Sequence, residues 1–151
     1  MYEQLGPNQE MAAYGARIVE TLLRNMAFGA KKALDKPDEE NIHDLRVTCL
    51  RLRHAVRLFD RLFGERRARK VRRRLRDVQD LLAAVRSCDV AGQVLEIEPV
   101  AASMSPRQRK RILAVLAQER RRSLRPLRAR LRKMQRSNVT QRWRTRLLGA
   151  A

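Results

Sequence analysis

The feature of this sequence that most constrains its fold is a row of apolar residues between positions 42 and 63. Its members follow one another at alternating intervals of three and four: Ile42, Leu45, Cys49, Leu52, Val56, Phe59 and Phe63. This spacing places them all on one side of an α-helix, as a stripe that is buried against neighbouring elements. Acidic residues at 38–40 suit the positive end of a helix, and Gly64 favours its end. We therefore predict a helix over about residues 39–63.

Apolar periodicity predicts three more long helices, at about 8–34, 66–95 and 106–135, and strand patterns are almost absent. Their apolar positions are Met11, Ile18, Leu22 and Met26 in the first, Val71, Leu75, Val78, Leu82 and Val85 in the second, and Ile112, Leu116, Leu124, Leu127, Leu131 and Met134 in the third. Ser105 before Pro106 is an N-cap and first-turn pair, and residues 97–105 are expected to form a loop. Pro126 predicts a kink or two shorter helices.

Four long helices joined by short connections predict an all-α protein, built as a four-helix up-and-down bundle. We expect residues 5–136 to form one domain. Residues 137–151 are expected to form a C-terminal tail or a short helix around Trp143.

The charge of the chain indicates a polyanionic partner. Lys and Arg total 35 against 16 Asp and Glu, which gives a formal net charge of +19. Such an excess makes the compact state repel itself, and a partner of opposite sign relieves that repulsion. Of the basic residues 29 are Arg, whose planar guanidinium donates paired hydrogen bonds to phosphate oxygens. High-GC codon usage explains a high Arg to Lys ratio equally well, but it does not explain the net charge.

Two cysteines, Cys49 and Cys88, lie on or near apolar helical faces and do not make a disulfide framework. The first ten residues lack the basic and apolar regions of a secretory signal. No run of about 18 apolar residues is present. These features predict a cytoplasmic protein without a membrane segment.

The basic residues of two predicted helices form stripes beside the apolar rows. In the 39–63 helix, His43, Arg46, Arg53, Arg57 and Arg61 share one side, adjacent to the apolar row rather than opposite it. The 66–95 helix also carries a basic stripe beside its apolar row, which consists of Arg69, Arg72, Arg76 and Arg86. Two such helices packed side by side would bring their stripes together in one electropositive groove.

Other charged residues favour simpler interpretations. The arginines of the 106–135 helix point in every direction, which is typical of a solvated helix: they are Arg120, Arg121, Arg122, Arg125, Arg128, Arg130 and Arg132. Some arginines of the stripes are expected to pair with nearby carboxylates at Asp44, Asp60, Asp77 and Asp80.

No pattern of catalytic or metal-ligating residues is evident, and we expect neither an enzyme nor a cofactor. His43 and His54 are eleven residues apart on one predicted helix, or about 16 Å at 1.5 Å per residue, so they cannot share a metal. Cysteine and histidine show no zinc spacing, and no glycine-rich phosphate loop is present. Glu96 and Glu98 form an isolated acidic pair beside Pro99.

Two blocks of sequence resemble a known family. The first contains His43, Arg46, Val47, Arg51, Leu52 and Arg53 after an acidic turn at 37–40, and the second contains Arg76, Arg86, Asp89 and Val90. In this order and separation they resemble the signature of the CHAD family, the conserved histidine α-helical domain. The chain departs from the family pattern at Leu50, Ala83 and Ser87.

The resemblance implies a helical bundle with a basic cavity that binds inorganic polyphosphate. By position it makes His43, Arg46, Arg51, Arg53, Arg76 and Arg86 candidate ligand contacts, which the stripes extend with Arg57, Arg69 and Arg72. Arg51 is turned away from its stripe in a helical projection. The partner expected from the resemblance is polyphosphate, with association to polyphosphate granules.

The family domain is usually twice this length and consists of two similar four-helix halves. This chain resembles only the first half, so two copies are expected to complete an eight-helix arrangement as a homodimer. Non-specific binding to nucleic acid is the alternative function, which the calculated isoelectric point of about 11.6 permits. Against it, aromatic residues make up only 4% of the chain, which leaves little for stacking on bases.

Overall fold

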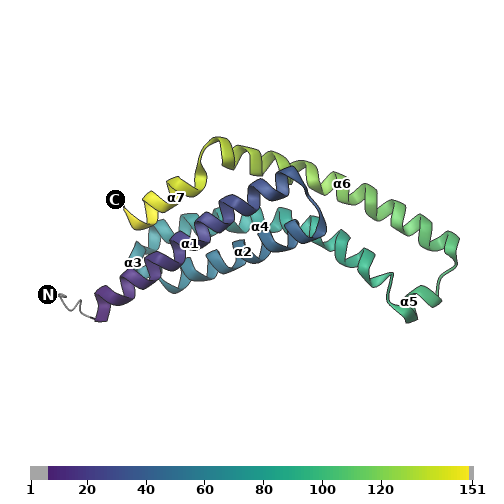
Figure 1. The fold of residues 1–151 in the computed structure, drawn as a ribbon, viewed down its shortest axis with the longest axis horizontal. Coiled ribbons are helices and arrows are strands. Elements are labelled where there is room, and N and C mark those ends of the chain that lie inside the picture. The colour runs from purple at the N-terminus through teal and green to yellow at the C-terminus, as the bar shows by residue number, and fades with distance from the viewer. Residues whose placement is uncertain (1–6, 150–151) are drawn as a thin grey trace.

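The computed structural model describes residues 7–149, and every regular element in this range is an α-helix (Figure 1). The helices are α1 (Pro7–Asp35), α2 (Glu39–Leu58), α3 (Asp60–Phe63), α4 (Glu65–Val94), α5 (Glu98–Ala102), α6 (Pro106–Arg136) and α7 (Val139–Leu148). The prediction of an all-α protein is confirmed over the described range. None of these helices is long and apolar enough to cross a membrane.

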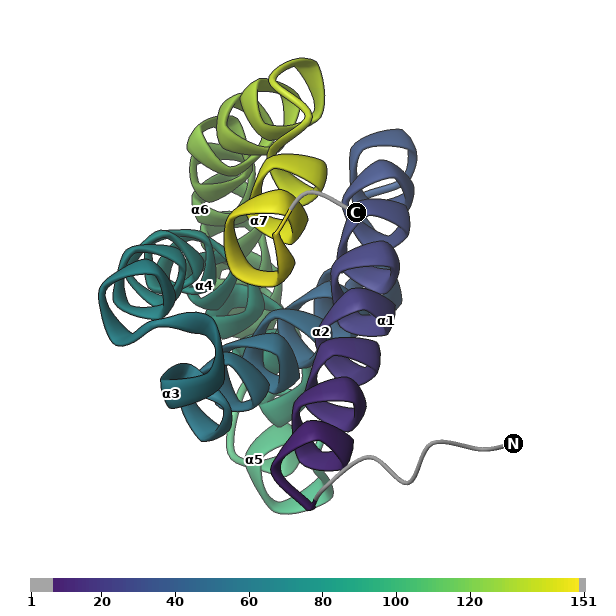
Figure 2. The ribbon, with the colours of Figure 1, turned by 90° about the vertical axis from the view of Figure 1, so that its left-hand side faces the viewer.

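The long helices pack in chain order. Helix α1 lies against α2, α2 against α4, and α4 against α6. Helix α1 also contacts α6, and α7 packs against α1, α4 and α6, as the end-on view in Figure 2 shows. Helix α2 is therefore flanked by α1 on one side and by α4 on the other.

The apolar rows of α2 and α4 are buried as predicted. All seven residues of the 42–63 row are buried, and so are the five residues between Val71 and Val85. The chain bends at Phe59, where α2 ends and the four-residue helix α3 begins. The rings of Phe59 and Phe63 pack edge to face with centroids 6.3 Å apart. Gly64 then turns the chain into α4 with a φ of +84°, a conformation that glycine adopts without strain.

The predicted apolar face of α1 is confirmed only in part, because Ile18 and Leu22 pack against the core while still partly exposed. Met26 is buried as expected, but Met11 is 54% exposed. The buried face instead consists of Gly15, Val19, Leu23, Met26, Ala30 and Ala33. Gly15 lets α1 approach α2 closely, because a Cβ atom there would lie 2.8 Å from the Phe59 ring. The prediction gave weight to large side chains, whereas close contact between helices is made here by small ones.

The predicted loop at 97–105 is partly helical, because Glu98–Ala102 form α5 with Pro99 in its first turn. Proline fits this position, since the N–H it lacks would have no partner there. Ser105 caps α6 as predicted. Its hydroxyl accepts a hydrogen bond from the Gln108 N–H, and the Gln108 side chain accepts one from the Ser105 N–H. Helix α6 continues through Pro126, so the alternative of two shorter helices is wrong.

Only the C-terminal half of α6 reaches the core. Leu124, Leu127, Leu131 and Met134 are buried, whereas Ile112 is 38% exposed. In Figure 1 the end of α4, α5 and the start of α6 project beyond the turn between α1 and α2. We call residues 90–116 the arm. The exposed apolar residues on it are Val90, Val94, Ile97, Ile112, Leu113 and Val115.

Helix α7 is part of the core. Its side chains Val139, Trp143 and Leu147 belong to the main cluster of buried apolar residues. The Arg144 Nε donates to Glu20 Oε1 at 2.8 Å, which joins α7 to α1. The segment after Ser137 is therefore held by both packing and an ion pair.

Replacing Trp143 with alanine is expected to lower the free energy of unfolding by about 3–5 kcal/mol, because the large buried side chain leaves a cavity. Chemical denaturation measures this loss. The control is Leu58→Ala, since that side chain is 76% exposed and its removal should change stability by less than about 0.5 kcal/mol. Equal losses in the two variants would contradict the packing of α7.

Candidate anion-binding site

An open cleft of about 460 Å³ lies between α2 and α4 and is lined almost entirely by arginine. Its lining residues are Arg53, His54, Arg57, Arg69, Arg72, Arg73 and Arg76. Five of the nine predicted binding residues meet here: Arg53, Arg57, Arg69, Arg72 and Arg76. We call this site the arginine cleft.

The cleft follows from how the two helices pack. The buried rows of α2 and α4 lie at their mutual contact, and the basic stripes are the positions next to those rows. The helices run in opposite directions, because Glu39 at the start of α2 contacts Gln93 at the end of α4. The end of the α2 stripe therefore faces the beginning of the α4 stripe.

The arginines of the cleft are largely without counter-charges. Among the described residues, no ion pair is formed by Arg53, Arg57, Arg69, Arg73 or Arg76. Arg72 forms one long ion pair, in which its Nη2 lies 3.9 Å from Asp60 Oδ2. The buried Nε of Arg72 has no hydrogen-bond partner. Clustered like charges repel one another, so this region is electrostatically unfavourable until an anion arrives.

Two predicted residues lie elsewhere. His43 and Arg51 line a second cleft of about 440 Å³, between α1 and α2, together with Lys32, Asn41 and Thr48. Arg51 also lines a third, more apolar cleft on the same flank, which it shares with His54. Because His54 lines the arginine cleft as well, it lies between the side of α2 that faces α1 and the side that faces α4.

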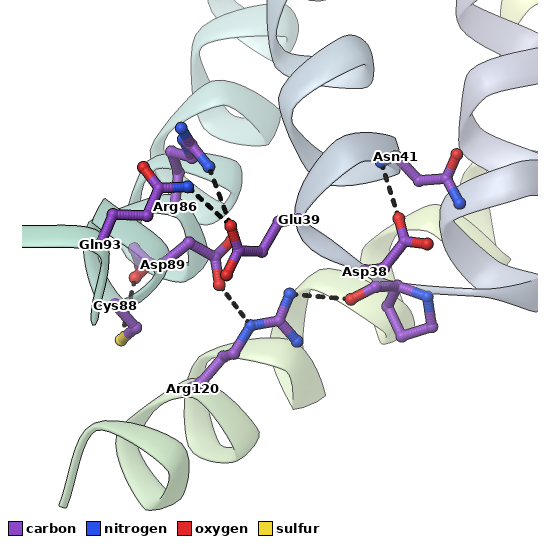
Figure 3. A network of polar contacts seen from close by, with 10 residues as sticks. Asp38, Glu39, Asn41, Arg86, Cys88, Asp89, Gln93 and Arg120 are labelled. Atoms are coloured by element: carbon purple, nitrogen blue, oxygen red, sulfur yellow. Dashed lines mark hydrogen bonds and ion pairs between the residues drawn. The ribbon is translucent and has the colours of Figure 1, made fainter. Parts of the chain in front are cut away.

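Arg46 and Arg86 are outside the lining of the arginine cleft. Arg46 is half-buried on α2, one residue after the buried Leu45. The Arg86 Nη1 lies 4.0 Å from Glu39 Oε2, and the same oxygen accepts a hydrogen bond of 2.7 Å from Gln93 Nε2. Figure 3 shows these three side chains converging where α2 begins and α4 nears its end.

A buried ion pair beside them holds the helices together. Asp89 on α4 is 4% exposed, and its Oδ1 accepts a hydrogen bond of 2.6 Å from Arg120 Nε on α6. Arg120 Nη2 also donates to the carbonyl of Pro37 at 2.8 Å, as Figure 3 shows. One guanidinium thus joins α4, α6 and the turn before α2. The interpretation of Arg120 as a solvated surface charge is wrong, because its partners come from distant parts of the sequence.

Comparison with family models gives a match to the CHAD domain over residues 17–151. The chain belongs to the CHAD domain family. Comparisons with curated proteins and with solved structures found no match.

The CHAD sequence blocks separate into two roles in this structure. Arg53 and Arg76 line the arginine cleft, whereas Asp89 is buried and anchors Arg120. The second block of the CHAD pattern therefore contributes to the fold as well as to the cleft. Within residues 7–149, no group of three His, Cys, Asp or Glu side chains is placed to hold a metal ion.

Two residues of the arginine cleft were not among the predicted binding residues. Arg73 directly follows the stripe residue Arg72, and its long side chain reaches the cleft from a neighbouring position. His54 lies at the outer edge of the α2 stripe and closes the cleft on that side. A wider stripe, drawn to allow for side-chain length, would have included both.

Shifted pKa values mark structural groups near the site. The pKa of Asp38 is lowered because its carboxylate accepts a hydrogen bond from the Asn41 N–H, with a further contribution from Lys36. Burial raises the pKa of the Cys49 thiol to about 12. The pKa of Cys88 is also raised, first by burial and then by the Glu119 and Asp89 carboxylates. Cys49 belongs to the main cluster of buried apolar residues, and the Cys88 Sγ donates to the carbonyl of Ala84.

Replacing Arg120 with alanine is expected to lower the free energy of unfolding by about 3–5 kcal/mol, because Asp89 is then left buried without its cation. Thermal or chemical unfolding measures the loss. Arg121→Ala is the matched control, since Arg121 is the next residue on α6 and is exposed. The control should change stability by less than about 0.5 kcal/mol. A similarly small loss for Arg120→Ala would show that the ion pair does not secure the helices.

Proposed function

We propose that this protein binds inorganic polyphosphate in the arginine cleft, without catalysing a reaction on it. The observation that carries the proposal is the absence of ion pairs at Arg53, Arg57, Arg69, Arg73 and Arg76 among the described residues, although their side chains share one cleft. Membership of the CHAD domain family, which is linked to polyphosphate, supports the choice of anion.

The chemistry of the cleft suits a linear chain of phosphates. Each guanidinium donates several hydrogen bonds in a fixed planar arrangement that matches phosphate oxygens. A polymer with charge on every unit satisfies several arginines at once and removes their mutual repulsion. Binding of this kind releases counterions and weakens steeply as salt is added.

The other predicted residues extend the proposed path. A long polymer leaving the arginine cleft passes His54 and reaches the flank of α2 where Arg51 and His43 lie. We therefore assign these residues to longer chains rather than to the central contact. We extend the proposal to association with polyphosphate granules in the cytoplasm.

Binding without catalysis is proposed from the nature of the lining groups. Arginine is not deprotonated in proteins and serves as neither a base nor a nucleophile. The one other described side chain that lines the cleft is His54, and no carboxylate or thiol is among the lining groups.

The double variant Arg53→Gln/Arg76→Gln is expected to bind long-chain polyphosphate about a hundredfold more weakly, because two charge-assisted contacts are lost. The slope of log K against log salt should also decrease by about two. Isothermal titration calorimetry over a salt series measures both quantities.

The matched control is Arg121→Gln/Arg132→Gln, which removes the same charge from exposed positions on α6. Equal weakening in the two double variants would mean that net charge alone, and not the cleft, binds the polymer. Displacement of bound polyphosphate by duplex DNA would favour nucleic acid as the partner instead.

We also propose that the chain acts as a four-helix up-and-down unit, with α1, α2, α4 and α6 as its long helices, and that two copies form a homodimer. The exposed apolar side chains of the arm offer a surface for the second copy, since Val115 is 65% exposed and Ile97 is 53% exposed.

Val115→Glu is expected to convert the dimer to a monomer, because a carboxylate would be buried at the contact between the arms. Light scattering at micromolar concentration measures the mass. Ala129→Glu adds the same charge at an exposed position later on α6 and should leave the dimer intact. A monomeric wild-type protein with full polyphosphate affinity would contradict the dimer.

A further inference from the structure

Charged residues recur at intervals of seven along α2 and into α3. Glu39, Arg46 and Arg53 lie on nearly the same side of α2, and Asp60 begins α3 beyond the bend at Phe59. The series has an acidic residue at each end and arginines between.

Each terminal carboxylate contacts an arginine of α4. Glu39 Oε2 lies 4.0 Å from Arg86 Nη1, and Asp60 Oδ2 lies 3.9 Å from Arg72 Nη2. Both arginines belong to the predicted stripe of α4. The carboxylates therefore stand at the two ends of the basic surface, where each one reaches the arginine opposite.

These contacts are weak enough for an external anion to replace them. Both distances exceed the range of a hydrogen bond, which ends near 3.2 Å for N–H to O. The Glu39 side chain is 54% exposed, and exposed ion pairs contribute little to stability. The buried Arg72 Nε has no hydrogen-bond partner at all. Arg72 and Arg86 thus retain donors that a phosphate can use.

We propose that Glu39 and Asp60 determine which anions the site accepts. Each carboxylate acts as an internal anion that holds one arginine, Arg86 for Glu39 and Arg72 for Asp60, and it repels the part of a polymer that extends past it. The proposal rests on the function proposed above. A short anion in the arginine cleft reaches Arg72 but not Arg86, which lies outside the cleft lining. A long polymer that continues along the α2–α4 side, rather than past His54, must displace a carboxylate from its arginine and overcome its repulsion.

Glu39→Gln is expected to tighten binding of long-chain polyphosphate about threefold to fivefold, because Arg86 is released and one repulsive charge is removed. Tripolyphosphate should show no such selective gain. The matched control is Glu40→Gln, which makes the same charge change in the same turn of α2 but on another side of the helix. Asp60→Asn, compared with Asp77→Asn on the exposed surface of α4, repeats the test at the other end.

A gain at Glu39→Gln that disappears when Arg86 is replaced with glutamine would support the proposal, because the effect then passes through that arginine. Equal affinities for Glu39→Gln and Glu40→Gln would overturn it, and so would weaker binding by Glu39→Gln. These outcomes are separate from the proposed function, which is tested by the wild-type protein. If the wild type does not bind polyphosphate, the proposed function and this inference both fail.

Discussion

The packing of α2 against α4 forces arginines of two helices into one cleft, and the rest of the structure depends on this contact. The residues at the contact are fully or almost fully buried, from Ile42 to Val56 on α2 and from Val71 to Val85 on α4. Their burial supplies the free energy that opposes the repulsion between the adjacent arginines. The same apolar contact that stabilises the fold therefore also brings the arginines together.

The other helices support this pair from outside the cleft. Helix α1 approaches the far flank of α2 through small residues such as Gly15, and α7 fills the space among α1, α4 and α6. Arg120 links α4, α6 and the turn before α2 through a buried ion pair and a carbonyl contact. Carboxylates thus serve two purposes here. Asp89 is buried and structural, whereas Glu39 and Asp60 stand exposed or half-exposed where the basic surface ends.

Helical periodicity predicted the parts of the fold that depend on one helix at a time. The residues predicted for the apolar rows of α2 and α4 are all buried, although Ala55, Ala68 and Asp89 are buried there as well, and the cap of α6 at Ser105 was predicted correctly. The buried face of α1 was predicted only in part, since Met26 is buried and Ile18 and Leu22 pack against the core, whereas Val19 and Leu23 were missed. The prediction also missed Gly15 and the buried alanines, which carry little hydrophobic signal. Arg120 looks like its neighbours in the sequence, and only its contacts with Asp89 and Pro37 distinguish it.

The sequence by itself determined the helices, the excess of arginine, the stripes beside the apolar rows and the resemblance to the CHAD family. The tertiary structure alone decided which of the nine predicted residues converge. It brought five of them into the arginine cleft and placed His43 and Arg51 on the other flank of α2. The physical reason is that periodicity gives the angle of a residue about its own helix axis. The neighbour that a residue faces depends on where the other helices lie, and no single helix carries that information.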